Sequence, residues 1–225
     1  QWYGTKYAHT FFDEAQRAQW RAATPADQPA LHLPPPNPYI PTDTALRENA
    51  GSAKSPALVL DTEGVKLWHL LDTSFKQPKA AVIIGLSSPL ALASPREAAL
   101  LRIGLEVFLE VINEDSYFAD EAGIALNVNN NSLSSPCVGL RISCNGYNQC
   151  LPALLTSVLT TLAALPVKTD VFQLIKAKTV EDYKNRKFQQ PYVHCHNASN
   201  RALQHPFFTD DERLKQLLPL KEEDL

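Results

Sequence analysis

The sequence predicts an α+β fold in which helices cover one face of an antiparallel sheet, preceded by a short helix and an extended proline-rich strap. Three observations support this class. After residue 56, short β-type runs alternate in blocks with long apolar helical patterns. Capping residues and proline precede the long patterns, as at helix starts. Five prolines within the eight positions from Pro34 to Pro41 exclude a helix or a central strand there.

The N-terminal part contains one predicted helix, over Asp13 to Ala23, which is rich in helix formers and stops before Pro25. The strap from Leu31 to Asp43 follows and is expected to be extended and polyproline-like. We therefore predict three parts: residues 1–43, a linker over 44–56, and a folded module over 57–225.

The module opens with β-type runs at Leu58 to Leu60, Val65 to Leu71 and Ala80 to Leu86. Turn residues separate the last two runs, which predicts two antiparallel strands in succession. The pattern then becomes helical. Ser94 is placed as an N-cap, Pro95 as the first helical residue and Glu97 as the partner in a capping box.

The helix from Ser94 to Asn113 is apolar nearly all round, so it is expected to be covered on most sides. A second short helix over 115–122 is closed by Gly123. The remaining elements are a hairpin and three helices. The hairpin joins Ile124–Val128 to Cys137–Cys144 through a turn at 129–132, and the helices cover Leu151–Leu165, Thr169–Gln189 and Asp210–Leu218, the last capped by Thr209.

Composition narrows the possible partners. Hydrophobic residues make up 44% of the chain and charged residues 20%, which is typical of a globular protein. The net charge is −3 with both signs mixed, so neither nucleic acid nor a membrane surface is an expected partner. The four cysteines include no CxxC pair and are predicted to be free thiols, as in the cytoplasm or another reducing intracellular compartment.

No constellation in the sequence predicts catalytic, cofactor-binding or metal-binding residues. His194-Cys195-His196 is the one metal-like cluster. If helical, its neighbouring side chains diverge by about 100°; if extended, its histidines align but lack further ligands. A structural or surface role is therefore predicted.

Two other patterns receive structural interpretations. Glu106, Glu110 and Glu114 are interpreted as the solvated edge of a helix, and Gly85–Pro89 as a strand-terminating turn.

Several segments in order resemble the middle of the insulysin/pitrilysin family of zinc metallopeptidases. They extend over nearly the whole chain. They are Trp2-Tyr3-Gly4-Thr5-Lys6-Tyr7, Leu31-His32-Leu33-Pro34, Pro36-Asn37-Pro38-Tyr39-Ile40-Pro41-Thr42-Asp43, Leu67-Trp68 with Asp72, Phe75 and Pro78-Lys79-Ala80, Gly146-Tyr147-Asn148, and Phe188-Gln189-Gln190-Pro191.

The resemblance implies four homologous α+β modules of LuxS/metallohydrolase-like peptidase type, paired into two halves around a peptide-holding chamber. An inverted HxxEH motif on a helix of the first module binds zinc. By resemblance, residues 1–43 are the tail of the second module and the strap between the halves, and residues 57–225 are most of a degenerate third module. The helix from Ser94 to Asn113 then stands in the place of the zinc helix and has no histidine.

The resemblance therefore predicts a noncatalytic internal segment of a zinc metalloendopeptidase, with zinc bound only elsewhere in the parent. Gln1 and the absence of methionine agree with an internal segment, and the family's third module has a further strand after the last helix. Expected partners are the other modules, peptide substrates and a second copy of the parent. The alternative is an independent interaction module that presents Pro35-x-x-Pro38 as a ligand.

Overall fold

The computed structural model describes residues 3–24, 33–46, 54–72, 74–131 and 139–225. The chain divides into two compact units, Gln1–Pro36 and Asn37–Leu225. In the first unit, α1 covers Glu14–Ala22, which confirms the predicted helix. The Asp13 side chain accepts a hydrogen bond from the Gln16 amide at 2.8 Å, and the Gln16 side chain accepts one from the Asp13 amide at 3.1 Å.

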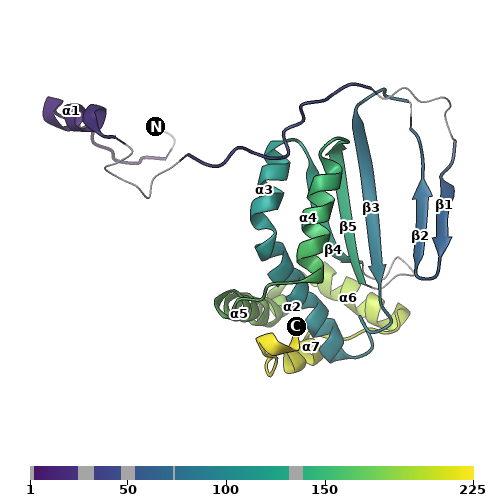
Figure 1. Ribbon diagram of the computed structural model, residues 1–225. Coiled ribbons are helices and arrows are strands. Elements are labelled where there is room, and N and C mark those ends of the chain that lie inside the picture. The colour runs from purple at the N-terminus through teal and green to yellow at the C-terminus, as the bar shows by residue number, and fades with distance from the viewer. Residues whose placement is uncertain (1–2, 25–32, 47–53, 73, 132–138) are drawn as a thin grey trace. The chain divides into compact units, whose positions relative to one another are not determined.

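The second unit is built on antiparallel strands with helices on one face of the larger sheet (Figure 1). The larger sheet has the order β3-β5-β4. Helices α2 and α3 contact β4, and α4 contacts β5. The predicted α+β class is therefore confirmed. The elements are β3 Lys79–Ser87, α2 Pro95–Val111, α3 Asn113–Glu121, β4 Ala125–Asn131, β5 Gly139–Tyr147 and α4 Leu151–Ala163.

The two N-terminal strands form a separate two-stranded sheet, in which β1 (Ala57–Thr62) pairs with β2 (Val65–His69). The predicted succession of Val65–Leu71 and Ala80–Leu86 as an antiparallel pair is wrong, because β3 pairs with β5 instead. The turn that was missed is the tight one at Glu63-Gly64, where Gly64 has φ +81°. A positive φ at this position suits glycine and closes β2 back onto β1.

The hairpin of β4 and β5 is confirmed, but its turn is not at the predicted residues. Asn129, Asn130 and Asn131 continue β4 and pair with Arg141, Leu140 and Gly139. Asparagine is tolerated there because β4 lies at the edge of the sheet. Residues 132–138, which include Cys137, lie outside the described part.

Three further helices complete the unit: α5 (Thr169–Asn185), α6 (Pro191–Leu203) and α7 (Asp210–Leu217). The first and last were predicted, although α5 ends at Asn185 and a short 3₁₀ turn covers Arg186–Phe188. A second 3₁₀ turn covers Glu222–Asp224. The sequence prediction missed α6, whose described residues include no buried side chain that would give a clear apolar stripe.

Helix α2 lies between two hydrophobic cores. Leu105, Phe108 and Ile112 pack with the sheet and α4, whereas Ala99, Ile103 and Val107 pack with α5 and α7. The apolar surface that nearly encircles this helix is thus buried on two sides, as its sequence predicted.

The strap contributes one residue to the first core. Tyr39 is only 4% exposed and packs among the side chains of that core. The second half of the strap therefore belongs structurally to the second unit. Leu31, His32 and residues 47–53 of the predicted linker lie outside the described part.

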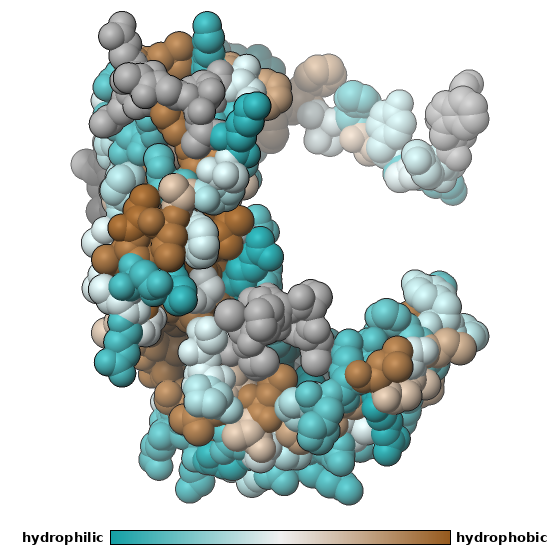
Figure 2. Space-filling model, turned by 90° about the vertical axis from the view of Figure 1, so that its right-hand side faces the viewer, coloured by the Kyte–Doolittle hydropathy of each residue, from teal (hydrophilic) through white to brown (hydrophobic). Residues whose placement is uncertain are grey.

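An apolar surface remains uncovered on the small sheet. Its exposed side chains come from both strands and the residue after them, and Figure 2 shows apolar patches on the face that carries this sheet. These residues, here called the β1–β2 apolar surface, are Leu58, Val59, Leu60, Val65, Leu67, Trp68 and Leu70.

Candidate functional site

The one metal-like cluster predicted from sequence lies on α6. His194, Cys195 and His196 are consecutive helical residues with exposed side chains. Adjacent side chains on a helix point about 100° apart, so the three cannot share one ion. Within the described residues, no group of three histidine, cysteine or acidic side chains is arranged to hold a metal.

Glu106 and Glu110 lie at the edge of the covered helix α2, whereas Glu114 lies in the first turn of α3. Glu106 forms an ion pair with Arg102 one turn away, with 2.8 Å between the charged atoms. Glu110 and Glu114 are exposed. Ser87 ends β3, and the Ser88 hydroxyl accepts a hydrogen bond from the Leu90 amide at 3.2 Å, as in a strand-terminating turn.

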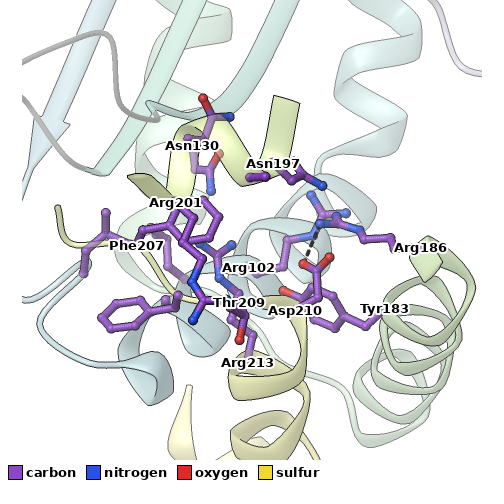
Figure 3. A pocket seen from close by; sticks show the side chains of 16 residues that line it. Arg102, Asn130, Tyr183, Arg186, Asn197, Arg201, Phe207, Thr209, Asp210 and Arg213 are labelled. Atoms are coloured by element: carbon purple, nitrogen blue, oxygen red, sulfur yellow. Dashed lines mark hydrogen bonds and ion pairs between the residues drawn. The ribbon is translucent and has the colours of Figure 1, made fainter. Parts of the chain in front are cut away.

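A cavity of the second unit lies beside α2. It has a volume of about 540 Å³ and is lined by residues of α2, β4, α5, α6 and the start of α7. Arg102, Arg186, Arg201 and Arg213 contribute to its wall. Figure 3 shows that Arg102, Arg201 and Arg213 gather at the same place although they come from three different helices.

Local sequence signals position these helices. Ser94 caps α2 by accepting a hydrogen bond from the Arg96 amide and by bonding to the Glu97 carboxylate. Thr209 caps α7 in a capping box with Glu212. The backbone hydrogen bond from Thr209 is the main cause that lowers the pKa of Glu212. Thr209 lines the cavity, and the two caps fix where the helices that carry Arg102 and Arg213 begin.

Two of the cavity arginines are compensated by acidic residues. Arg102 is paired with Glu106, and Arg186 is paired with Asp210 at 2.9 Å. The Arg186 guanidinium also lies 5.0 Å from the centre of the Tyr183 ring, within the range of a cation–π contact. In the described part of the chain, Arg201 and Arg213 form no ion pair. Besides the hydrogen bonds from Thr209, the charge of Arg201 acts on the nearby Glu212 carboxylate and lowers its pKa. The lining itself has four arginines and one carboxylate, Asp210, and so carries excess positive charge.

Among the described residues, two buried donors at the cavity have no hydrogen-bond partner. They are the hydroxyl of Tyr183, a residue only 6% exposed, and the Nε–H of Arg213. Figure 3 shows Tyr183 directed from α5 into the cavity beside Asp210. Leaving a buried polar group unsatisfied costs about 1–3 kcal/mol. These unsatisfied donors and the arginine-rich lining make this cavity the candidate for a binding site.

The chemistry of the cavity does not fit a zinc ion. Zinc is held by cysteine, histidine and carboxylate ligands, and the cavity offers one carboxylate, Asp210, already paired with an arginine. The arginine lining would repel a dication and favours an anion instead. No step of metal chemistry is therefore assigned to these residues.

Sequence reasoning missed this site because its residues are spread from Leu92 to Arg213. Arg201 and Arg213 had no sequence signal, because nothing in their spacing shows that α6 and α7 bring them to one cavity.

The fold places a long helix, α2, between an antiparallel sheet and a second helical layer. The family model described as the middle or third domain of peptidase M16 matches residues 1–216, and the chain belongs to this family. The predicted resemblance to insulysin and pitrilysin is thereby confirmed.

Individual relatives agree with this assignment. Insulin-degrading enzyme-like 1, peroxisomal, from Arabidopsis thaliana is 34% identical over 100% of this chain and 22% of its own length. The insulin-degrading enzyme of Homo sapiens is 28% identical over 97% of this chain and 21% of its own length. The crystal structure of pitrilysin matches with a TM-score of 0.80 and 25% identity, over 94% of this chain and 22% of that chain. The chain thus spans about a fifth of the length of these relatives.

Proposed function

We propose that this chain is a noncatalytic middle segment of a zinc metalloendopeptidase, that it forms part of the wall of the peptide chamber, and that its strap is part of the hinge between two halves. The observation that carries the proposal is on α2. This helix corresponds, by family resemblance, to the zinc helix of the active module, but it has no histidine. Towards the cavity it contributes Ala98, Leu101 and Arg102.

The chemistry of the whole enzyme would then come from outside this chain. In such an enzyme, a zinc-activated water attacks the peptide carbonyl with a glutamate as general base. This segment would contribute binding and shape, because a chamber wall holds a peptide by complementary surface and charge.

The other modules of the parent are the proposed occupants of the β1–β2 apolar surface. An apolar surface of this kind is typically covered by a partner. The chain spans only about a fifth of its relatives, which leaves the rest of the parent as the natural partner. Trp68→Lys is expected to abolish association of the chain with the remaining modules expressed separately. Tyr192→Lys, at another exposed aromatic position on α6, should leave the association intact. Equal association of both variants would contradict this occupant.

The noncatalytic assignment is tested by adding zinc and a fluorogenic peptide to the chain. We expect less than one zinc per chain and no cleavage above a buffer control, whereas the full-length parent should cleave the same peptide. Zinc-dependent cleavage by the chain would refute the proposal. Finding HxxEH upstream in the parent would support the source of the zinc site proposed here.

Two further parts of the proposal concern the setting of the parent. The thiols of Cys144 and Cys150 are buried and that of Cys195 is exposed and free, which supports a reducing intracellular compartment. None of the helices in the described part is long and apolar enough to cross a membrane.

A homodimer of the parent is tested by analytical ultracentrifugation. The family match does not favour the alternative of an independent module that presents Pro35-x-x-Pro38.

A further inference from the structure

We propose that the arginine-lined cavity binds the C-terminal residue of a peptide, with the terminal carboxylate on the arginines and the last side chain against the apolar wall. This inference depends on the proposed function in one respect: a segment of the wall of a peptide chamber would meet peptides as ligands.

The charge of the cavity argues for a carboxylate. Arg201 and Arg213 form no ion pair in the described part of the chain, and the Arg213 Nε–H and the Tyr183 hydroxyl are buried donors without partners. A guanidinium presents parallel N–H donors that match the two oxygens of a carboxylate. A bound carboxylate would therefore bring negative charge to a lining of four arginines and one carboxylate, and would supply acceptors for the two unpartnered donors.

The rest of the lining argues for a ligand with an apolar group. Leu92, Leu101, Phe207 and Phe208 form part of the same wall as the arginines. A free inorganic anion would leave this apolar surface unused, whereas the last residue of a peptide brings a carboxylate and a side chain together. The volume of about 540 Å³ lies within the range of roughly 300–1,000 Å³ found for small-ligand sites.

The proposal is tested by fluorescence anisotropy with an N-terminally labelled hexapeptide that ends in leucine, compared with the same peptide as its C-terminal amide. The 225-residue chain is used without zinc, so that binding is measured apart from any cleavage. We expect the free acid to bind roughly tenfold or more tightly than the amide, because the amide cannot form the charge-assisted pair.

Variants locate the binding in the cavity. R201Q and R213Q should each weaken binding of the free acid and leave binding of the amide unchanged. R141Q, which removes an exposed arginine of β5 outside the cavity lining, should change neither. Y183F removes the unpartnered hydroxyl and should weaken binding of the acid without reducing the thermal stability of the free chain. Circular dichroism on each variant checks that it is folded.

Three results would overturn the proposal. The first is equal affinity for the acid and the amide, and the second is equal loss of affinity in R141Q and R201Q. The third is displacement of the peptide by inorganic phosphate when the phosphate concentration is no higher than the peptide concentration that half-saturates the chain. The first two would exclude a carboxylate at this place, and the third would assign the cavity to a simple oxyanion. None of them bears on whether the chain cleaves peptides, so the proposed function is judged separately.

Discussion

The hydroxyl of Tyr39 donates a hydrogen bond to the carboxylate of Asp115 at 2.9 Å. The other oxygen of the same carboxylate accepts a hydrogen bond from Ser157 at 2.6 Å. Asn37 donates to the carbonyl of Phe118 at 2.7 Å. The strap is thus fastened to α3, and through Asp115 it is linked to α4, at the point where it enters the second unit.

Replacing Tyr39 by phenylalanine is expected to lower the free energy of unfolding by about 1–2 kcal/mol, because the buried ring stays but Asp115 loses a hydrogen-bond donor. Tyr117→Phe, at an exposed position on α3, is the matched control and should change stability by less than about 0.5 kcal/mol. Urea unfolding at pH 7 measures both. Equal stability of the two variants would show that the link does not hold the strap.

The same pair predicts a pH dependence. Burial, and then the adjacent Asp115, raise the pKa of Tyr39 to about 12. In the unfolded chain a tyrosine titrates near 10. Because the folded state favours the neutral hydroxyl, this stabilisation is complete below pH 10 and is lost as the pH rises through about 12. The difference in stability between the wild type and Tyr39→Phe should therefore shrink from pH 10 to pH 12, and a constant difference would contradict the link.

Replacing Gly146 by alanine is predicted to lower the stability of the module. A Cβ at this position of β5 would lie 2.8 Å from Cγ1 and 2.9 Å from Cα of Ile124, too close for atoms that include backbone. Gly146→Ala should cost about 1–3 kcal/mol through overpacking. Gly85→Ala on β3 is the control, since nothing lies within 4 Å of its added Cβ. Thermal unfolding that shifts equally for both variants would refute the steric argument.

Lys176 is predicted to hold the end of the chain against α5. Its ammonium group donates to the carbonyls of Leu218 and Leu220 at 2.8 and 2.7 Å, just beyond α7. Lys176→Met keeps the aliphatic stem but leaves these carbonyls without the donor, so we expect a loss of about 1–2 kcal/mol. Lys178→Met, on an exposed position of the same helix, should be nearly neutral. Hydrogen exchange should show faster opening of α7 in the first variant alone.

The prolines of the strap are predicted to matter for the parent enzyme rather than for the fold. Replacing Pro34, Pro35 and Pro36 by glycine leaves the contacts of Tyr39 untouched but makes the segment before it more flexible. We expect the module to keep its melting temperature and the full-length parent to change its rate of peptide turnover. Unchanged turnover would count against the hinge.

Local signals made much of the fold predictable. Ser94, Pro95 and Glu97 marked the start of α2, Gly123 the end of α3, and Thr209 the start of α7, because each satisfies backbone groups at a helix end. Helix α6 escaped prediction because it has no buried stripe, although Pro191 at its start was a usable signal. The β1–β2 hairpin escaped because its turn depends on the single residue Gly64.

The candidate site was beyond the reach of sequence patterns for a different reason. A metal motif has a fixed spacing on one element, whereas the cavity exists only where α2, α5, α6 and α7 meet. Arg201 and Arg213 gain their significance from the cavity that they line together, and that property depends on tertiary packing. Family resemblance pointed to α2 as the counterpart of the zinc helix but supplied no residues for an anion.

The position of α2 also determines how the module must fold. One side of this helix completes the core under the sheet, and another side completes the core with α5 and α7. Both cores need side chains of α2, so the stability of the sheet and that of the C-terminal helices are coupled through this one helix. Loss of α7 should therefore loosen strands that it does not cover, and the second unit should melt in one transition rather than layer by layer.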